Sequence, residues 1–315
     1  MWDVHAHVIP QEVLDAAQSG LYDLSLEGEW LIIDKRRVLV RHLASLEGLA
    51  RYAEKFGLSL VLSVPPALLR DDERSPGWHR FLNEAMDSAR RRLAVASQML
   101  AVLPLASVKA ALGEWHRVQD RALGLVMGSD INQKLVGHPD FEPFWRNYAK
   151  AGGGLAFIHG HRAYDARLNA YYLDNLVGFP GEDTLATAAL VFSGLPLDYP
   201  QIQWCVSHGG GGAAMLLGRW QRGYDTHRPG IDTSRPSPRE IFQRLWFDSV
   251  VHDPRALSYL LSMAPRRVVF GTDYPFPMGM QHQLEAGQWS QSTMQQIATN
   301  TENLMKTVTK GRTIL

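Results

Sequence analysis

The sequence predicts an α/β protein of the (β/α)8 TIM-barrel class with a small insertion after the first strand, and three observations lead to this prediction. The chain of 315 residues has the length of one large barrel domain covering residues 1–315. Short runs rich in β-branched and other apolar residues alternate with stretches of helical composition. Several of these runs end in histidine, and barrels of this class carry their chemistry at the carboxyl ends of strands.

Eight apolar runs are the candidates for parallel strands, at residues 2–7, 58–64, 93–103, 123–128, 155–159, 202–208, 245–251 and 267–271. The third, fourth and fifth runs are preceded by stretches of helical composition at 76–92, 106–121 and 140–151. Parallel neighbours need a long crossover connection, usually a helix, so this alternation favours a parallel barrel. Closing helices are expected within residues 284–306.

Residues 11–57 do not follow the alternation and are expected to form the insertion after the first strand. Within this segment, residues 31–40 predict a small hairpin that turns around Asp34 and Lys35. We expect the insertion to cover the mouth of the barrel.

The charge balance excludes two classes of partner. Lysine and arginine together number 32, aspartate and glutamate together also number 32, and the sequence pI is about 7.2. No global field therefore attracts nucleic acid or an anionic membrane surface. No apolar run approaches the roughly 18 residues of a membrane span, so no such span is predicted.

The location that the sequence predicts is the cytoplasm. The N-terminal residues Met1 to His5 lack the basic region and the apolar core of a signal peptide. The single cysteine, Cys205, cannot form an internal disulfide, which suits a reducing compartment.

Five polar side chains stand at the ends of predicted strands, where packing gives no reason for them. His5 and His7 are two residues apart and so point to the same face of the first strand. The fifth, sixth and eighth strands end at or just before His159, His208 and Asp273. One histidine at a strand end is usually a hydrogen-bonded structural residue, but five independent placements favour a shared site. Imidazoles and a carboxylate are ligands that a divalent cation such as Zn²⁺ prefers.

Three segments carry a resemblance to a known family, namely Asp3-Val4-His5-Ala6-His7-Val8-Ile9-Pro10, Val206-Ser207-His208-Gly209-Gly210-Gly211 and Gly271-Thr272-Asp273-Tyr274-Pro275-Phe276-Pro277. They resemble signature segments of the amidohydrolase superfamily, and more narrowly of its 2-amino-3-carboxymuconate-6-semialdehyde decarboxylase-like branch. Residues 176–184 and 248–254 extend the resemblance, which runs patchily from residue 1 to about residue 280.

The resemblance implies a role for each of the five side chains. His5, His7, His159 and Asp273 would bind a divalent metal, most often Zn²⁺ and alternatively Mn²⁺. His208 would be the catalytic acid/base. Asp273 would also act as a catalytic residue if the reaction were a hydrolysis, by taking a proton from water.

The resemblance further implies arginines that hold a substrate carboxylate. Arg51 stands six residues before Gly57, which matches the family spacing ahead of the second strand. Arg219, eleven residues after His208, matches an arginine that is donated across a homodimer interface, and Arg228 is a weaker match. Guanidinium groups suit bidentate binding of carboxylates, whereas the plain alternative for each arginine is a surface salt bridge.

The segment His159-Gly160-His161 departs from the family pattern, which commonly has His-Pro-Trp here. The substrate pocket is therefore expected to differ from that of the branch. His161 is a further candidate for substrate binding, and the alternative is that its side chain points into a loop.

The leading hypothesis is a metal-dependent, non-oxidative decarboxylase of a small unsaturated or aromatic carboxylic acid, of the carboxymuconate semialdehyde or hydroxy- and aminobenzoate type. The same ligands would also serve a hydrolase of lactones or amides, because a metal lowers the pKa of bound water. A third alternative is a metal-binding homologue without activity. Analysis of the products separates these hypotheses, since only the decarboxylase releases CO₂.

Overall fold

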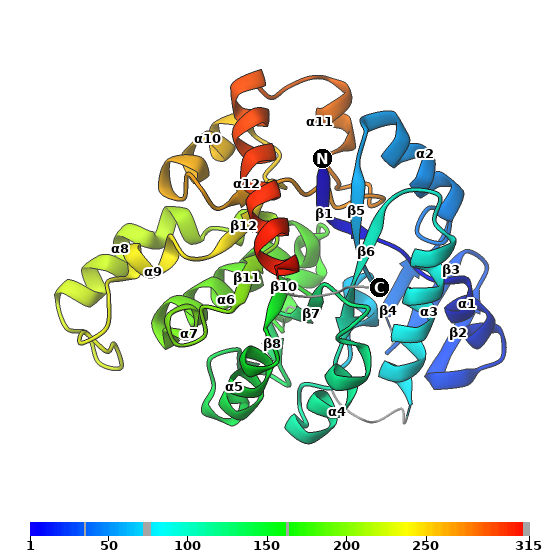
Figure 1. The fold of residues 1–315 in the computed structure, drawn as a ribbon, viewed down its shortest axis with the longest axis horizontal. Coiled ribbons are helices and arrows are strands. Elements are labelled where there is room, and N and C mark those ends of the chain that lie inside the picture. The colour runs from blue at the N-terminus through cyan, green and yellow to red at the C-terminus, as the bar shows by residue number, and fades with distance from the viewer. Residues whose placement is uncertain (35, 72–76, 162–163, 311–315) are drawn as a thin grey trace.

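The computed structural model describes residues 1–34, 36–71, 77–161 and 164–310, and its strands form the predicted barrel. One parallel sheet of eight strands has the order β1-β5-β6-β7-β10-β11-β12-β13. These strands are β1 (Trp2–His7), β5 (Ser59–Ser63), β6 (Ser97–Val102), β7 (Gly124–Gly128), β10 (Gly154–His159), β11 (Ile202–Val206), β12 (Trp246–Asp248) and β13 (Val268–Val269). Figure 1 shows helices around them, which confirms the (β/α)8 class.

The barrel closes between its first and last strands. The Val4 amide donates to the Phe270 carbonyl at 2.9 Å, and the His7 amide donates to the Tyr274 carbonyl at 2.7 Å. Ala6 and Tyr274 form an isolated parallel bridge. The chain that follows β13 therefore runs beside β1, and this brings the carboxyl ends of the two strands together.

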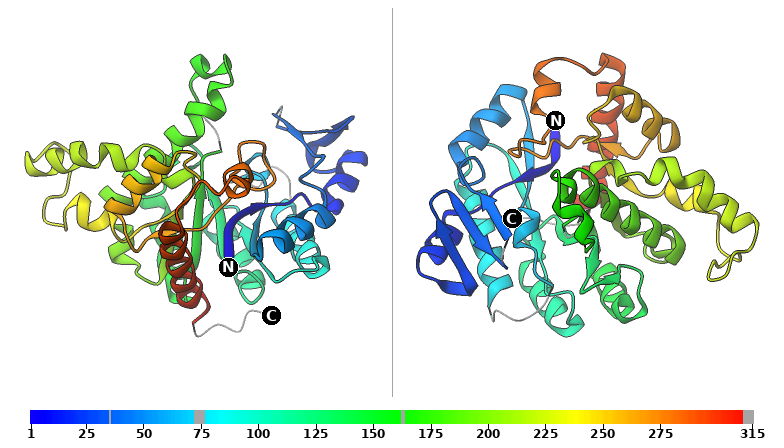
Figure 2. Two further views of the ribbon diagram at one scale, coloured as in Figure 1. Left: turned by 90° about the horizontal axis from the view of Figure 1, so that it is seen from above. Right: turned by 180° about the vertical axis from the view of Figure 1, so that it is seen from behind.

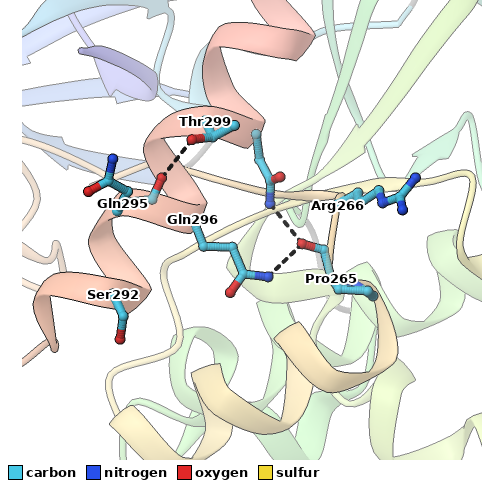
Figure 3. Close-up of a pocket in the computed structure, with 7 residues that line it drawn as sticks. Pro265, Arg266, Ser292, Gln295, Gln296 and Thr299 are labelled. Carbon is cyan, nitrogen blue, oxygen red and sulfur yellow. Dashed lines mark hydrogen bonds between the residues drawn. The ribbon is translucent and has the colours of Figure 1, made fainter.

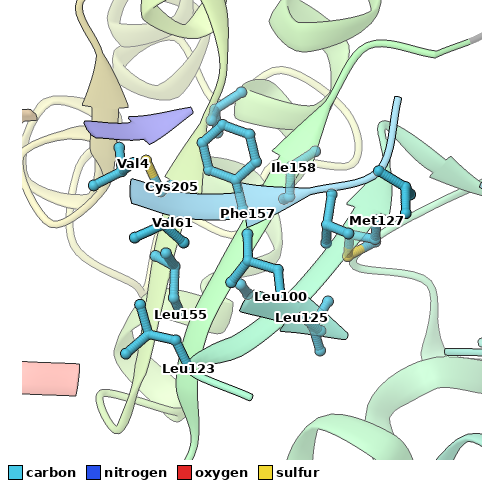
Figure 4. Close-up of a cluster of buried hydrophobic side chains, with 14 of the residues drawn as sticks. Val4, Val61, Leu100, Leu123, Leu125, Met127, Leu155, Phe157, Ile158 and Cys205 are labelled. Atoms are coloured by element: carbon cyan, nitrogen blue, oxygen red, sulfur yellow. The ribbon is translucent and has the colours of Figure 1, made fainter. Parts of the chain in front are cut away.

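Apolar side chains from neighbouring strands pack tightly inside the fold. Figure 4 shows one such cluster, in which the side chains of Val4, Val61, Leu100, Leu125 and Phe157 are at most 1% exposed. Strands covered on both faces have nearly continuous apolar sequences. The apolar runs were therefore sufficient to locate the eight strands of the barrel.

A helix follows each barrel strand and covers the outside of the sheet, as Figures 1 and 2 show. These helices are α2 (Leu46–Phe56), α3 (Trp78–Arg92), α4 (Val108–Val118), α5 (Glu142–Lys150), α6 (Phe179–Ser193), α8 (Ala213–Asp225), α10 (Pro254–Met263) and α12 (Gln291–Thr309). Shorter helices are α1 (Gln11–Gln18), α7 (Leu195–Asp198), α9 (Pro238–Phe242) and α11 (Gln281–Glu285). None of the helices in the described ranges is long and apolar enough to span a bilayer.

Three of the barrel strands are shorter than predicted by three residues or more. β6 begins later because α3 runs up to Leu93, whose amide still bonds to the Ala89 carbonyl at 3.1 Å. β12 ends at Asp248, because its side chain accepts the Val250 amide proton at 3.1 Å and the chain turns there. β13 keeps only two paired residues, Val268 and Val269.

The predicted hairpin is part of a larger unit. β3 (Trp30–Ile33) and β4 (Arg36–Leu39) correspond to the prediction, but a third antiparallel strand, β2 (Leu24–Glu27), was missed. Its sequence, Leu-Ser-Leu-Glu, alternates over only four residues, which is too short a signal. Lys35, in the predicted turn, and Pro76, the predicted start of a helix, lie outside the described residues.

This small sheet is attached to the carboxyl end of the barrel. The Arg36 guanidinium donates to the Ala67 carbonyl at 2.7 Å and to the His161 carbonyl at 3.5 Å, and these residues follow β5 and β10. Arg70 donates to the Tyr22 carbonyl at 2.9 Å and lies over the Trp78 ring. The insertion therefore contacts the same end of the barrel that carries the candidate site.

Replacement of Gly124 by Ala tests the packing of the barrel strands. A Cβ atom at Gly124 would lie 1.9 Å from the Leu155 carbonyl oxygen of the neighbouring strand, so β7 and β10 would have to separate. We expect Gly124→Ala to lower the free energy of unfolding by at least about 1–3 kcal/mol. The matched control is Gly113→Ala in α4, where a Cβ atom meets nothing within 4 Å.

The control should stabilise the protein by about 0.5–1 kcal/mol, because glycine is unfavourable inside a helix. Urea unfolding of both variants measures the two effects. Equal stability of Gly124→Ala and the wild type would contradict the observed strand packing.

Candidate metal centre

Four buried side chains meet at the carboxyl end of the barrel. His5 and His7 come from β1, His159 ends β10, and Asp273 follows β13. One ligand atom from each lies within 4.8 Å of the others. The Asp273 Oδ1 atom is 3.2 Å from His5 Nε2 and 3.0 Å from His7 Nε2, and these two nitrogens are 3.0 Å apart.

The other ring nitrogen of each imidazole is already used, and this decides which nitrogen faces the centre. The His5 Nδ1 atom donates to Asp248 at 2.5 Å, that of His7 to the Val64 carbonyl at 3.0 Å, and that of His159 to the Gly160 carbonyl at 2.6 Å. The Nε2 lone pairs are therefore left to point inward.

These residues fit a divalent cation. Within the described residues, the buried Nε2 atom of His159 has no hydrogen-bond partner, as expected for a metal ligand. Burial, together with the neighbouring imidazoles, holds the pKa of His159 well below its ordinary value, so this ring is neutral as coordination requires. Three imidazoles and one carboxylate are a donor set that suits Zn²⁺ and related ions.

Asp273 is held in place from β1. It adopts a left-handed backbone conformation, with φ 57°, and its amide donates to the His5 carbonyl at 2.8 Å. The preceding Thr272 donates to Asp3 from both its amide, at 3.1 Å, and its hydroxyl, at 2.5 Å. Burial raises the pKa of Asp3 to about 7.

His208 lies beside the centre without belonging to it. Its ring centroid is 4.8 Å from that of His159, and its Nε2 atom is 3.9 Å from Asp273 Oδ2. Its Nδ1 atom contacts Asp183 at 2.7 Å. Burial alone would lower the pKa of His208, but the carboxylates of Asp183 and Asp273 outweigh burial and raise that pKa well above its ordinary value.

Three carboxylates that organise the site, Asp3, Asp183 and Asp248, were not identified as site residues from the sequence. The alternation Asp3-Val4-His5-Ala6-His7 could have indicated Asp3, because it shares the strand face of the two histidines. Asp183 and Asp248 lie far from their histidines in the sequence, and only the folded barrel brings them into contact.

The predicted arginines lie outside this cluster. Arg51 is exposed on α2 and forms an ion pair with Glu47. Among the described residues, no hydrogen bond or ion pair joins Arg51, Arg219 or Arg228 to the four ligands. A surface hollow of about 590 Å³ at the end of α8 is lined by Arg219, Arg222, Gly223, Thr226 and Arg228.

His161 is buried and sits over the end of β7. A Cβ atom at Gly128 would lie 2.1 Å from the His161 Cε1 atom, so the glycine makes room for this ring. The imidazole therefore packs at the carboxyl end of the barrel instead of pointing into solvent.

A second hollow, of about 580 Å³, lies away from the candidate chemistry, and Figure 3 shows the residues around it. Pro265 and Arg266, which precede β13, line it together with residues of α12, so it belongs to the amino end of the barrel. The Gln296 and Asn300 amides donate to the Pro265 carbonyl at 2.8 and 3.1 Å and hold the helix against this loop.

Comparison with known proteins agrees with this geometry. The profile of the amidohydrolase family matches residues 2–297. The chain belongs to the amidohydrolase family. This confirms the relationship that the sequence motifs predicted.

Among curated relatives, the chain is similar to the 2-amino-3-carboxymuconate-6-semialdehyde decarboxylases of Dictyostelium discoideum and Caenorhabditis elegans. The first is 33% identical over 211 residues, covering 65% of this chain and 58% of the relative. The second is 30% identical over 197 residues, covering 52% of this chain and 48% of the relative. The chain thus spans about half the length of the curated relatives it matches.

Solved structures of two decarboxylases share the fold. The 5-carboxyvanillate decarboxylase of Sphingomonas paucimobilis has a TM-score of 0.80 at 21% identity, with 97% of this chain and 98% of that chain covered. A dihydroxybenzoic acid decarboxylase from Polaromonas, solved with bound manganese, has a TM-score of 0.74 at 17% identity, with coverages of 97% and 96%. At these identities the likeness shows the barrel fold alone.

Replacement of Asp248 by Asn tests the orientation of the candidate metal ligands. Asp248 Oδ1 accepts the Gly209 and Val250 amide protons at 2.9 and 3.1 Å, so the side-chain oxygen of an asparagine must take that place. Its NH₂ group would then face His5 Nδ1 and shift the imidazole proton to Nε2, where it blocks a cation. We expect the affinity for divalent metal to fall about 10- to 100-fold.

Competition with a chromophoric chelator measures this affinity. The matched control is Asp87→Asn, which alters an equally buried carboxylate in the ion pairs of α3. Unchanged affinity in Asp248→Asn, or an equal loss in the control, would contradict the orienting role.

Proposed function

We propose that the protein is a metal-dependent carboxy-lyase that releases CO₂ from a small unsaturated or aromatic carboxylic acid without oxidation. The observation that carries this proposal is the placement of His208, whose Nε2 atom faces the Asp273 carboxylate at 3.9 Å beside the four ligands. The decarboxylase relatives support this reaction class. Hydroxybenzoates, aminobenzoates and carboxymuconate semialdehydes are the substrates that we propose.

The reaction requires a proton at the carbon that carries the carboxylate. We assign His208 Nε2 to deliver this proton to the ring or alkene carbon. The bond to the carboxylate then breaks, CO₂ leaves, and the bonding electron pair stays behind and restores conjugation. When bound, a divalent cation, Zn²⁺ in our proposal with Mn²⁺ as the alternative, would supply Lewis acidity toward a substrate oxygen.

The two oxygens of Asp273 would then have different tasks. Oδ1 lies among the Nε2 atoms of His5 and His7 and is the ligand atom. Oδ2 lies toward His208 Nε2, which suits proton exchange with that ring. This is the catalytic part that we assign to Asp273 besides coordination.

Substrate carboxylates would be held by Arg51, by His161 and by arginines of a second copy of the chain. Helix α8 extends away from the barrel in Figures 1 and 2, and Arg219 lies on it. One turn earlier on this helix, Met215 is 74% exposed, an apolar surface that suits contact with a second subunit. We therefore propose a homodimer in which Arg219 reaches the partner's site, with Arg228 at the same hollow.

A reducing cytoplasm is the location that fits this proposal. The single cysteine, Cys205, is fully buried in β11.

Replacement of His208 by Ala tests the acid/base assignment. We expect turnover to fall at least about 10²-fold, because general acid–base catalysis contributes this much, while the metal content stays the same. The assay follows CO₂ release from a panel of hydroxybenzoates, aminobenzoates and a carboxymuconate semialdehyde. His116→Ala, an exposed histidine of α4, is the control and should keep full activity.

Normal CO₂ release by His208→Ala would remove its assigned role. Hydrolysis of lactones or amides without CO₂ release would replace the carboxy-lyase proposal by a hydrolase. Full metal content without turnover of any compound would indicate an inactive metal-binding homologue.

Mixing two inactive variants tests the shared site. Arg219→Ala keeps its metal ligands, and His159→Ala keeps its arginine, so a mixed dimer holds one complete site. After random reassortment at equal concentrations, we expect about a quarter of the wild-type activity, because half of the dimers are mixed. Full dimer exchange without any recovery would place Arg219 in its own chain or outside the reaction.

A further inference from the structure

We infer that Asp183 is a positioning residue that sets which nitrogen of His208 carries the fixed proton, an inference that rests on the proposed role of His208. The Asp183 side chain is fully buried just after the first turn of α6. Its Oδ2 atom lies 2.7 Å from His208 Nδ1. Because an ionised carboxylate only accepts hydrogen bonds, this contact keeps a proton on Nδ1. His208 Nε2 is then the atom that faces the metal centre.

The other oxygen of Asp183 is fixed by the two loops that form the centre. Oδ1 accepts the Gly160 amide proton at 2.7 Å and the Ser207 hydroxyl proton at 3.1 Å. Gly160 follows the ligand His159, and Ser207 precedes His208. One carboxylate therefore joins the loop of a metal ligand to the loop of the proton carrier.

Glycines let α6 come close enough for these contacts. A Cβ atom at Gly160 would lie 2.4 Å from the Phe179 carbonyl oxygen, and one at Gly211 would lie 1.9 Å from that of Pro180. The Thr184 hydroxyl also accepts the Gly212 amide proton at 2.8 Å. The first turn of α6 is thus packed directly against the loops after β10 and β11.

The neighbouring Glu182 does not share this position. Its carboxylate accepts the Ser129 hydroxyl proton at 2.9 Å, on the side of β7. Of the two adjacent acidic residues, Asp183 is the one that contacts the proposed proton carrier.

The fixed donor at Gly160 makes the effect of an asparagine predictable. The backbone N–H can only donate, so the side-chain oxygen of Asp183→Asn must face it. The NH₂ group then faces His208 Nδ1, which has to accept a hydrogen bond, so the ring keeps a proton only on Nε2. The variant keeps the shape of the site but removes the proton from Nδ1.

The first experiment observes the proton directly and needs no substrate. Protein labelled with ¹⁵N-histidine and loaded with Zn²⁺ is studied by NMR, and His208→Ala identifies the signals of His208. In the wild type we expect a proton bonded to Nδ1 in addition to the proton that Nε2 carries for delivery, and in Asp183→Asn we expect a proton on Nε2 only. The control Asp87→Asn should keep the wild-type pattern. An Nδ1 proton that persists in Asp183→Asn overturns the inference.

The second experiment is a double-mutant cycle on CO₂ release. We expect Asp183→Asn to lower kcat about 10- to 100-fold with a nearly unchanged KM and metal content. In a His208→Ala background, the same change should have no further effect on kcat, because Asp183 acts on the reaction only through the imidazole that this variant lacks. An equal loss in both backgrounds would show a merely structural role and overturn the inference.

The two hypotheses fail in different ways. If His208→Ala keeps normal turnover, the proposed acid/base role fails. If His208→Ala loses turnover but Asp183→Asn does not, only the inference about Asp183 fails.

Discussion

The structure of the site depends on one constraint, that each of the three imidazoles of the candidate metal centre places its Nδ1 proton on a fixed acceptor. His5 uses Asp248, while His7 and His159 use backbone carbonyls. An unpaired N–H in this buried place would cost about 1–3 kcal/mol, so the acceptors hold the rings firmly. The Nε2 atoms of the three rings therefore point toward one another. The closure of the barrel between β1 and β13 places the Asp273 carboxylate beside the Nε2 atoms of His5 and His7.

The meeting of His5, His7, His159 and Asp273 could be predicted from the sequence, because each lies near or just after the end of a readable strand. His5, His7 and His159 close apolar runs that are buried on both faces, and the parallel barrel gathers such ends at one rim. The sequence also shows where glycines stand near the strand ends, but only the structure shows why a larger residue would not fit there. A Cβ atom at Gly271, for example, would lie 2.9 Å from that of His5.

The orienting carboxylates could not be predicted, because nothing local relates them to their histidines. Asp183 lies 25 positions before His208, and Asp248 lies 243 positions after His5. Their contacts depend on how α6 and β12 pack in the finished barrel. The arginines are a third case. The spacing known from the family indicated Arg219, but its contact with a site depends on a second copy of the chain.

Charge explains why a cation and a protonated His208 belong together in this buried place. Asp183, Asp248 and Asp273 bring three negative charges within contact of the imidazoles, and a dication plus one imidazolium balances them. Burial opposes a charge on His5, yet Asp273 and Asp248 outweigh it and raise the pKa of that imidazole to about 9. A proton and a cation thus compete for the same Nε2 lone pair. The surrounding carboxylates therefore stabilise positive charge at this site. Because the Nδ1 atoms of His5, His7 and His159 are held by hydrogen bonds, only their Nε2 atoms are left to bind that charge.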